Sequence, residues 1–384
     1  MRFKLLLFFY FIASLSLFLY SYTQVDLNLT LSRVSLWQTI QRAFQYVGYF
    51  QRPVSTVWYL VTLSAFFVLY GIVLVCMKRK TMGEQDLWKI VIAVTVMLVL
   101  SYPAFSYDMF NYMFTAKTVL IYQKNPYAVL PLQFAGIDPW INFMRWVHLP
   151  SAYTPLWIAL TLPAYLFGFQ LFLFILWNMK LLVAGFYLFS VWCVGAILKQ
   201  SDKSNAVLGM GILALNPLII IESLVSAHND IAMMAFALLA IYLFIKKKYW
   251  SAWFVLALSI ALKLMTIFLV PAALTKWKKG FALVGMSLGL ILVLTRREFL
   301  PWYFVWVLPF VALLPTMTTV LVIASGLSLG LLLQYAPYLY YGHWNAPVPV
   351  LKWWVTVVPV ALASIGLFLR HMIVSRNSVR RRDS

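Results

Sequence analysis

Acidic side chains are the scarcest reactive groups in this chain, with 10 Asp and Glu residues among 384. An ionised side chain within or beside an apolar segment is costly, and it therefore marks a candidate functional site. Five acids lie instead in lysine-containing loops, in the first polar loop or near the C-terminus: Glu84, Asp86, Asp202, Asp26 and Asp383. The candidates that remain are Asp108, Asp138, Glu222, Asp230 and Glu298.

Asp108 is the candidate for acid–base chemistry. It follows an apolar run and lies within an aromatic stretch, residues 102–112. A carboxylate held there could act as a general base that accepts the proton of a hydroxyl nucleophile. Asp is also a good N-cap, so the same residue could simply begin an interfacial helix. The two interpretations have equal support from the sequence.

Two further polar features stand in apolar surroundings. His228, Asn229 and Asp230 precede an apolar run. They could hydrogen-bond a sugar or a phosphate, or they could cap the helix that follows. Lys263 is isolated between apolar residues. It could snorkel towards the membrane surface, but its depth in the run favours a phosphate or carboxylate partner.

An arginine pair and several aromatic residues could complete a substrate site. Arg296 and Arg297 directly precede an aromatic stretch that contains Trp302 and Tyr303. An Arg pair suits bidentate binding of a phosphate, although it could also be solvated loop charge. Tyr153 lies in a second aromatic stretch. Both stretches are denser than an interfacial aromatic belt requires, and aromatic faces also stack on sugar rings.

Neither a metal nor a cofactor is indicated. The chain has no glycine-rich phosphate loop, no metal-ligand spacing of His or Cys, and no Asp-x-Asp pair. A divalent cation held by carboxylates therefore has little support. Cys76 and Cys193 lie inside apolar runs, which indicates neither a disulfide framework nor a metal cluster.

The elements that must position these residues are membrane helices. Hydrophobic residues make up 64% of the chain and charged residues 10%, whereas a soluble domain carries about 25% charged residues. One soluble core could not bury this much apolar surface, so soluble, disordered and fibrous classes are excluded. The net charge of +20 comes from short basic clusters between apolar runs. This pattern is typical of the positive-inside rule and of contact with membrane lipids, and it does not indicate nucleic-acid binding.

The first part of the chain predicts helices around a long polar loop. We expect a retained N-terminal helix over residues 1–20, an amphipathic interfacial helix within 21–56, and membrane helices over 57–77 and 87–102. Residues 103–151 are more polar but still aromatic. They predict a folded extracytoplasmic catalytic loop, because structureless loops of this length are uncommon and usually functional.

Basic clusters set the expected topology of the rest. If they are cytosolic, then either residues 153–168 are re-entrant or residues 169–198 cross more than once. Residues 250–262 and 264–274 are each short for a span of about 20 residues. This predicts a broken hairpin around Lys263.

The expected fold class is therefore an all-α polytopic membrane protein. We expect one integral-membrane domain, residues 1–384, with about 10 to 13 transmembrane or re-entrant helices. Residues 370–384 form its expected basic cytoplasmic tail. On this topology the candidate acids share the extracytoplasmic face.

Taken in order, motifs between residues 101 and 309 resemble those of the GT-C superfamily of integral-membrane glycosyltransferases. The similarity is greatest to bacterial polyprenyl-phosphate-mannose-dependent mannosyltransferases and to the catalytic subunit that adds the first mannose in GPI-anchor synthesis. The motifs are Tyr107-Asp108 to Tyr112, Asn125-Pro126-Tyr127, Tyr153 to Trp157, Asn216-Pro217-Leu218 with His228-Asn229-Asp230, Lys263 within Ala261 to Leu264, and Pro301 to Trp306 ahead of Leu308-Pro309.

The resemblance implies an inverting transfer of a hexose, such as mannose, from a polyprenyl-phosphate donor to a glycan or glycolipid acceptor on the extracytoplasmic face. It assigns the catalytic carboxylate to Asp108. The chain departs from the family pattern in having two helices before the helix that leads into the loop, and in lacking a second acid two residues from Asp108. The predicted substrate-binding residues are Lys263, Arg296, Arg297, His228, Asn229, Asp230, Tyr153, Trp302 and Tyr303.

The main alternative is a transporter or lipid flippase that uses Asp108, Glu222, Asp230 and Lys263 as an ion or proton relay. Transporters often carry paired repeats, which are not evident here. A membrane scaffold and an oligosaccharide-ligase-like enzyme are further alternatives. In the enzyme interpretation, the protein lies in the plasma membrane of a prokaryote or in the endoplasmic reticulum membrane of a eukaryote.

Overall fold

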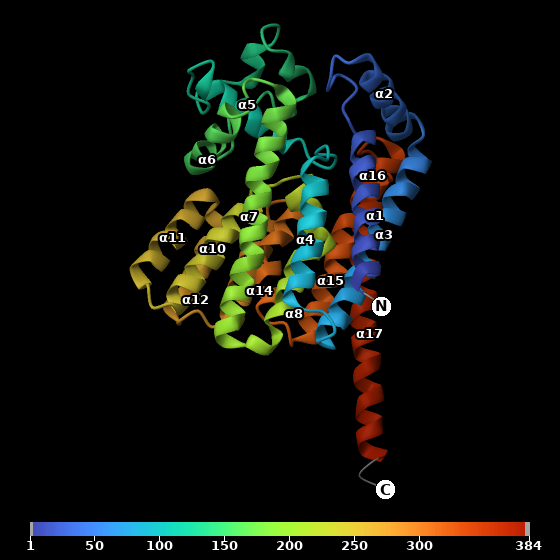
Figure 1. Ribbon diagram of the computed structural model, residues 1–384, viewed down its shortest axis with the longest axis vertical. Helices are drawn as coiled ribbons and strands as arrows, with labels where there is room; N and C mark the ends of the chain where they lie inside the picture. The colour runs from blue at the N-terminus through green and yellow to red at the C-terminus, as the bar shows by residue number, and fades with distance from the viewer. Residues whose placement is uncertain (1–2, 381–384) are drawn as a thin grey trace.

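The apolar helices form a bundle that carries a cap of shorter elements at one end (Figure 1). The computed structural model describes residues 3–380, with side chains through residue 373. Every regular element within these residues is helical, which confirms the expected all-α class. Arg2 and residues 381–384 of the expected basic tail lie outside the described residues.

Long apolar helices form the frame of the bundle. Within the described residues, five are long and apolar enough to cross a membrane, or six if a pair bent by 54° over residues 203–225 counts as one span. The five are α1 (Phe3–Thr23), α3 (Arg52–Lys78), α7 (Phe172–Ser201), α15 (Thr318–Leu333) continued by α16 (Tyr335–Tyr341), and α17 (Val348–Arg380).

Shorter helices fill the space between these spans. The shorter helices do not test the expected count of about 10 to 13 segments, which stays a prediction. They are α4 (Glu84–Val99), α8 (Ala206–Ala214), α9 (Pro217–Ile220), α10 (Asp230–Ile245), α11 (Tyr249–Leu262), α12 (Val270–Leu274), α13 (Lys279–Leu294) and α14 (Leu308–Ala312). Short 3₁₀- or π-helical segments join them: η3 (Lys203–Asn205), the π-helical η4 (Ile221–Val225), η5 (Leu264–Leu269) and η6 (Pro301–Trp306).

The cap contains the long polar loop, and it is folded as expected. Its elements are α2 (Ser35–Phe50), α5 (Asp108–Leu120), η1 (Pro131–Phe134), η2 (Pro139–Phe143) and α6 (Pro155–Leu166). Within the loop, Asp138 forms a 2.6 Å ion pair with Lys117 and accepts a 3.0 Å hydrogen bond from the backbone N of Trp140, at the start of η2.

Two helix lengths bear on how often residues 153–198 cross the membrane. The 12 residues of α6 extend about 18 Å at ~1.5 Å per residue, too short for a hydrocarbon core of ~30 Å. In contrast, α7 continues for 30 residues, which is long enough for one pass. These lengths favour the first of the two expected solutions, in which residues 153–168 are re-entrant, and the topology stays a prediction.

The basic clusters gather at the end of the bundle opposite to the cap. Glu84 at the start of α4 pairs with Lys199 near the end of α7, at 2.8 Å. Lys279 at the start of α13 donates a 2.8 Å hydrogen bond to Ser201 Oγ. The cap and these basic ends therefore lie on opposite sides of the bundle (Figure 1).

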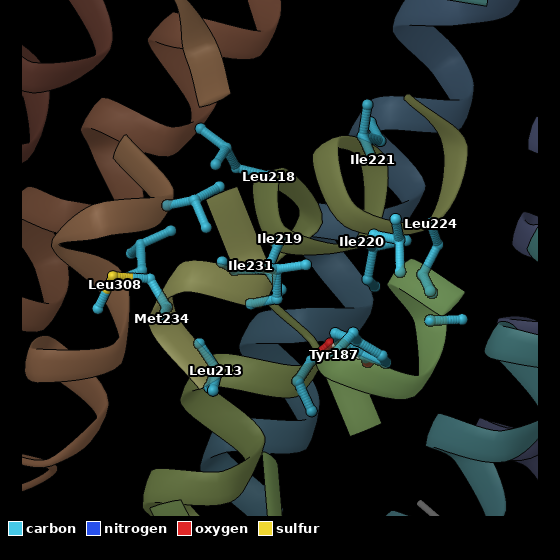
Figure 2. Packing of buried hydrophobic residues seen from close by; sticks show 14 of the residues in the cluster. Tyr187, Leu213, Leu218, Ile219, Ile220, Ile221, Leu224, Ile231, Met234 and Leu308 are labelled. Atoms are coloured by element: carbon cyan, nitrogen blue, oxygen red, sulfur yellow. Dashed lines mark hydrogen bonds between the residues drawn. The ribbon is translucent and has the colours of Figure 1, made fainter. Parts of the chain in front are cut away.

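The longest run of buried residues in the described part of the chain extends on both sides of the segment 222–230. Leu218 to Ile221 and Leu224 precede or lie in this segment, and Ile231 and Met234 follow it; all are buried among side chains of α7, α8 and α14 (Figure 2). Close approach of helices depends on glycine here, because a Cβ on Gly209 of α8 would lie 2.6 Å from the carbonyl oxygen of Ala312. Small residues permit such packing between membrane helices. The core thus fixes both ends of the segment 222–230.

Candidate active site

A cavity of about 730 Å³ lies beneath the cap, and most of the predicted site residues line it. Its walls come from α5, from the loop before α6, from the break between α11 and η5, and from η6 with the residues before it. These segments are far apart in the chain. The predicted residues in the wall are Asp108, Tyr153, Asn229, Lys263, Arg297, Trp302 and Tyr303.

Asp108 is the first residue of α5. It lines the cavity, and its carboxylate is directed towards His228, which lies behind the cavity wall. The N-cap of this helix is Tyr107, which makes no side-chain capping hydrogen bond. Asp108 therefore begins a helix, as the capping interpretation supposed, but its carboxylate is directed elsewhere. Its Oδ2 lies 3.3 Å from Nδ1 of His228. An acid in the first turn is still favoured by the helix dipole.

His228 is enclosed by two carboxylates and an indole ring. Its Nδ1 faces Asp108, and its Nε2 lies 3.4 Å from Oε2 of Glu222. Its ring stacks on Trp302, with centroids 4.3 Å apart and planes inclined by 22°. The side chain is only 2% exposed. The predicted residue is thus behind the cavity wall, in contact with the carboxylate that lines it.

The charges of Asp108 and His228 stabilise each other. Burial works against the ionised form of Asp108, but the hydrogen bond and charge of His228, followed by the charge of Lys263, lower the pKa of Asp108 below its ordinary value of 3.8. Burial likewise opposes the cationic form of His228. The hydrogen bond and charge of Asp108, and the charges of Glu222 and Asp230, nevertheless raise the pKa of His228 above 6.5. Asp108 and His228 therefore each favour the charged form of the other.

Lys263 and Asp230 form a second charged pair. Nζ of Lys263 lies 2.6 Å from Oδ1 of Asp230, which also accepts a hydrogen bond from Nε1 of Trp306. The lysine stands at the break between α11 and η5, where its backbone is extended (φ −159°, ψ 125°). This break is the expected hairpin around Lys263. The lysine lines the cavity, and its ammonium group pairs with Asp230 instead of snorkelling to the membrane surface.

Aromatic side chains connect the cap to the bundle. The hydroxyl of Tyr153 faces Asp108, and its ring meets that of Tyr112 edge-on at 4.6 Å. The hydroxyl of Tyr112 accepts a 3.3 Å hydrogen bond from the backbone N of Asn229. Thr154 Oγ1 donates to the carbonyl of Leu262 at 3.1 Å. These contacts hold α5 and the start of α6 against the segments that carry Asn229 and Lys263.

The two predicted arginines have different surroundings. Both are exposed and follow the end of α13. Arg297 borders the cavity, whereas Arg296 is not among the residues that line it. Glu298, next in the chain, also borders the cavity and pairs with Lys352 of α17. Of the arginine pair, only Arg297 is placed to contact a molecule in the cavity.

The backbone between Asn216 and Asp230 explains how His228 reaches its position. Asn216 Oδ1 accepts a 2.9 Å hydrogen bond from the backbone N of Leu218, and Pro217 begins α9, so this motif is a helix start. The chain then widens into the π-helical η4, and Ala227 adopts a left-handed conformation with φ 55°. The backbone N of His228 donates to the carbonyl of Glu222 at 2.9 Å. π-Helical turns occur frequently at functional sites.

Sequence reasoning assigned no site role to some residues that matter here. Glu222 was one of the candidate acids, but nothing in its spacing linked it to His228. Lys180 is 1% exposed within α7, and its Nζ donates to Ser101 O (2.5 Å), Ser101 Oγ (2.7 Å) and Leu98 O (2.9 Å). It thereby caps the C-terminal end of α4, which leads into the polar loop 103–151. A lysine interrupting a 30-residue apolar helix was the signal that could have identified it.

The acidic and imidazole groups do not converge on one point. Across the described residues, no group of three or more His, Cys, Asp or Glu side chains is arranged to hold a metal ion. Asp108 and Glu222 lie on opposite ring nitrogens of His228. Transfer without a metal stays a prediction.

Comparison with known proteins supplies the family. The family model for "Alpha-(1->6)-mannopyranosyltransferase, N-terminal domain" matches residues 12–279, which is well over half of the chain. The chain belongs to this mannosyltransferase family. No curated protein matches the chain, and neither does any solved structure.

Membership in the mannosyltransferase family establishes the class of reaction. The chain is a glycosyltransferase, and the resemblance to GT-C mannosyltransferases is confirmed. A mannosyltransferase needs a sugar donor and a glycan acceptor. The apolar helices make it an integral membrane protein. The matched region extends from within α1 to the first residue of α13, so it includes Asp108, His228 and Lys263.

Proposed function

We propose that this mannosyltransferase moves mannose from a polyprenyl-phosphate donor to a glycan or glycolipid acceptor at the extracytoplasmic face, with inversion and with Asp108 as the general base. The observation that carries the proposal is the cavity itself. One wall has a carboxylate whose Oδ2 lies 3.3 Å from His228. Lys263, Arg297 and aromatic rings line the other walls. A base, cations and sugar-stacking faces thus meet around one space.

The mouth of the cavity supports a lipid donor. Trp146, Leu149 and Leu264 line it and are 59%, 50% and 65% exposed. If this edge of the cap lies at the membrane surface, an amphiphile could enter past these side chains with its chain still in the bilayer. The sequence offers no glycine-rich loop for a nucleotide diphosphate. A polyprenyl monophosphate therefore suits this entrance better than a nucleotide sugar.

The proposed reaction is a single displacement. The acceptor oxygen forms a bond to the anomeric carbon as the bond from that carbon to the phosphate oxygen breaks, and Asp108 takes the acceptor proton. The leaving polyprenyl phosphate keeps the bonding electron pair, and Lys263 and Arg297 stabilise its growing negative charge. One displacement inverts the anomeric centre. An α-(1->6)-mannoside, as in the family description, therefore requires a β-linked donor.

The predicted roles of the remaining residues follow from their positions. Tyr153, Trp302 and Tyr303 present aromatic surface to the sugar. Asn229 lines the cavity, whereas His228 and Asp230 act from behind the wall through Asp108 and Lys263. The transporter alternative loses its support, because the family is one of enzymes. The extracytoplasmic cap would face outward from the plasma membrane in a prokaryote, or into the endoplasmic reticulum lumen in a eukaryote.

The direct test uses the full-length protein in lipid nanodiscs. Polyprenyl-phosphate [¹³C]mannose and GDP-[¹³C]mannose are supplied separately with mannose-terminated glycolipid acceptors, and products are identified by mass spectrometry. We expect labelled product from the polyprenyl donor only. Product formed equally well from GDP-mannose would contradict the lipid-donor proposal. A β-mannoside product from a β-linked donor would contradict the single displacement.

A further inference from the structure

Glu222 is a fully buried carboxylate outside the cavity. Its exposed fraction is 0%, and it lies in the π-helical η4, between α9 and the segment that leads to His228. Oε1 accepts a 2.9 Å hydrogen bond from the hydroxyl of Tyr335, at the start of α16. Oε2 has no hydrogen-bond partner, and the group that faces it is Nε2 of His228, 3.4 Å away. A buried carboxylate is costly unless it is paired with a cation.

The backbone brings Glu222 and His228 together in an unfavourable conformation. The π-helical turn is followed by Ala227 with φ 55°, a conformation that costs a residue with a Cβ free energy. The result is a short closed turn in which His228 N donates to Glu222 O at 2.9 Å. Strain of this kind persists where the surrounding packing enforces it, and the core on both sides of the turn does so.

We propose that Glu222 is a positioning residue, which holds the His228 ring with Nδ1 directed at Asp108 and keeps the ring cationic, and which thereby sets the pH range of transfer. This inference rests on the proposed function of Asp108. His228 is bounded by Asp108 from α5, by Glu222 from η4, and by Asp230 from α10, which is itself paired with Lys263. Trp302 covers one face of the ring.

The arrangement has a definite consequence for pH. Burial alone would lower the pKa of His228, and the facing carboxylates raise it above 6.5. The stability that the raised pKa of His228 contributes is therefore present below its ordinary pKa and is lost as the pH rises through the raised pKa. Loss of one facing charge within about 4 to 6 Å moves a pKa by about 1 to 3 units. Glu222→Gln should accordingly lower the pKa of His228 by at least about 1 unit.

Histidine NMR measures the pKa of His228 independently of the transfer activity. The chain has four histidines, so ¹³C-histidine labelling of the full-length protein gives few signals, and His228→Asn identifies the relevant one. In the wild type we expect a midpoint above 6.5, the ordinary value for histidine. Glu222→Gln should lower it, and the alkaline limb of kcat/KM should move by the same amount. Glu84→Gln is the matched control, because Glu84 pairs with Lys199 at the opposite end of the bundle.

A second substitution weakens the charge of Glu222 without removing its carboxyl group. Tyr335→Phe removes the hydrogen bond to Oε1 that favours the ionised form of Glu222, so it should move the midpoint in the same direction as Glu222→Gln, but by less. An unmoved midpoint in folded Glu222→Gln protein would overturn the proposal. If that variant does not fold, the wild-type midpoint decides, because a value at or below 6.5 equally overturns it. If the midpoints are as expected but no mannose is transferred, the proposed function is contradicted and the positioning of His228 by Glu222 is not.

Discussion

Replacement of Asp108 by Asn is the sharpest test of the catalytic assignment. The amide keeps the size of the carboxylate and can still accept a hydrogen bond from His228 Nδ1, now 3.3 Å from Oδ2. It cannot accept a proton. A general base typically contributes a rate factor of ~10²–10⁴, equivalent to about 3 to 5 kcal/mol. We therefore expect kcat to fall by at least ~10²-fold.

The expected effect of this substitution on stability is much smaller. Asp108 is not the N-cap of α5, so no capping bond is lost. The losses are an acid near the helix N-terminus and the charge in one hydrogen bond, together about 1 to 2 kcal/mol. His228 keeps Glu222 as a partner, so it is not left as an unpaired buried cation. Because the pKa of Asp108 is lowered, this stability is present above its ordinary pKa and is lost as the pH falls below it.

The assay is the initial rate of mannose transfer at saturating donor, measured with the thermal unfolding temperature of the same preparation. Asp138→Asn is a matched control in the same loop. Asp138 is buried and pairs with Lys117 away from the cavity lining, so this variant should lose stability more than rate. A rate for Asp108→Asn within about threefold of wild type, far short of the ~10²-fold loss expected of a base, would refute the assignment. So would an equal loss of rate in folded Asp138→Asn protein.

Further predictions concern binding, folding and orientation. Arg297→Ala should raise the donor KM by about 10-fold or more, as expected for a lost charged hydrogen bond of ~1.5 to 3 kcal/mol, and Arg296→Ala should not; equal effects in steady-state kinetics would contradict the distinction. Lys180→Met should destabilise the protein by about 1 to 3 kcal/mol, because the carbonyl groups that Lys180 caps lose their donor; unchanged thermal unfolding would argue against that capping role. In a cysteine-free background, Ala135→Cys should react with an external impermeant thiol reagent and Lys248→Cys should not, and the reverse pattern would invert the proposed orientation.

Features that depend on residues close together in the sequence were predictable from the sequence. Hydropathy and charge predicted the all-α membrane class, the folded loop at 103–151 and the break at Lys263, because each depends on residues that are neighbours in sequence. The predicted partner of Lys263, a phosphate or a carboxylate, was left open. Its contact with Asp230 in the structure supplies a carboxylate, and the phosphate stays a prediction.

Relations between distant segments could not be read from the sequence. The contact between Asp108 and His228 joins the cap to the bundle, and only the packing of the helices specifies it. The role of Glu222 depends on a π-helical turn and on the left-handed Ala227, neither of which has a residue signature there. Arg296 and Arg297 were equivalent in sequence, yet only one of them borders the cavity, because consecutive residues at the end of α13 point in different directions.

The two-sided mouth of the cavity has a consequence for what happens after the reaction. Trp146, Leu149 and Leu264 give it an apolar edge, whereas the exposed Arg297 and Glu298 give it a charged one. With the proposed polyprenyl-phosphate donor, the two products differ in the same way, since the spent carrier would be mostly hydrocarbon and the lengthened glycan mostly hydroxyl. On this proposal each product would have its own exit, the carrier sideways into the bilayer and the glycan outward into water, and neither departure would have to wait for the other.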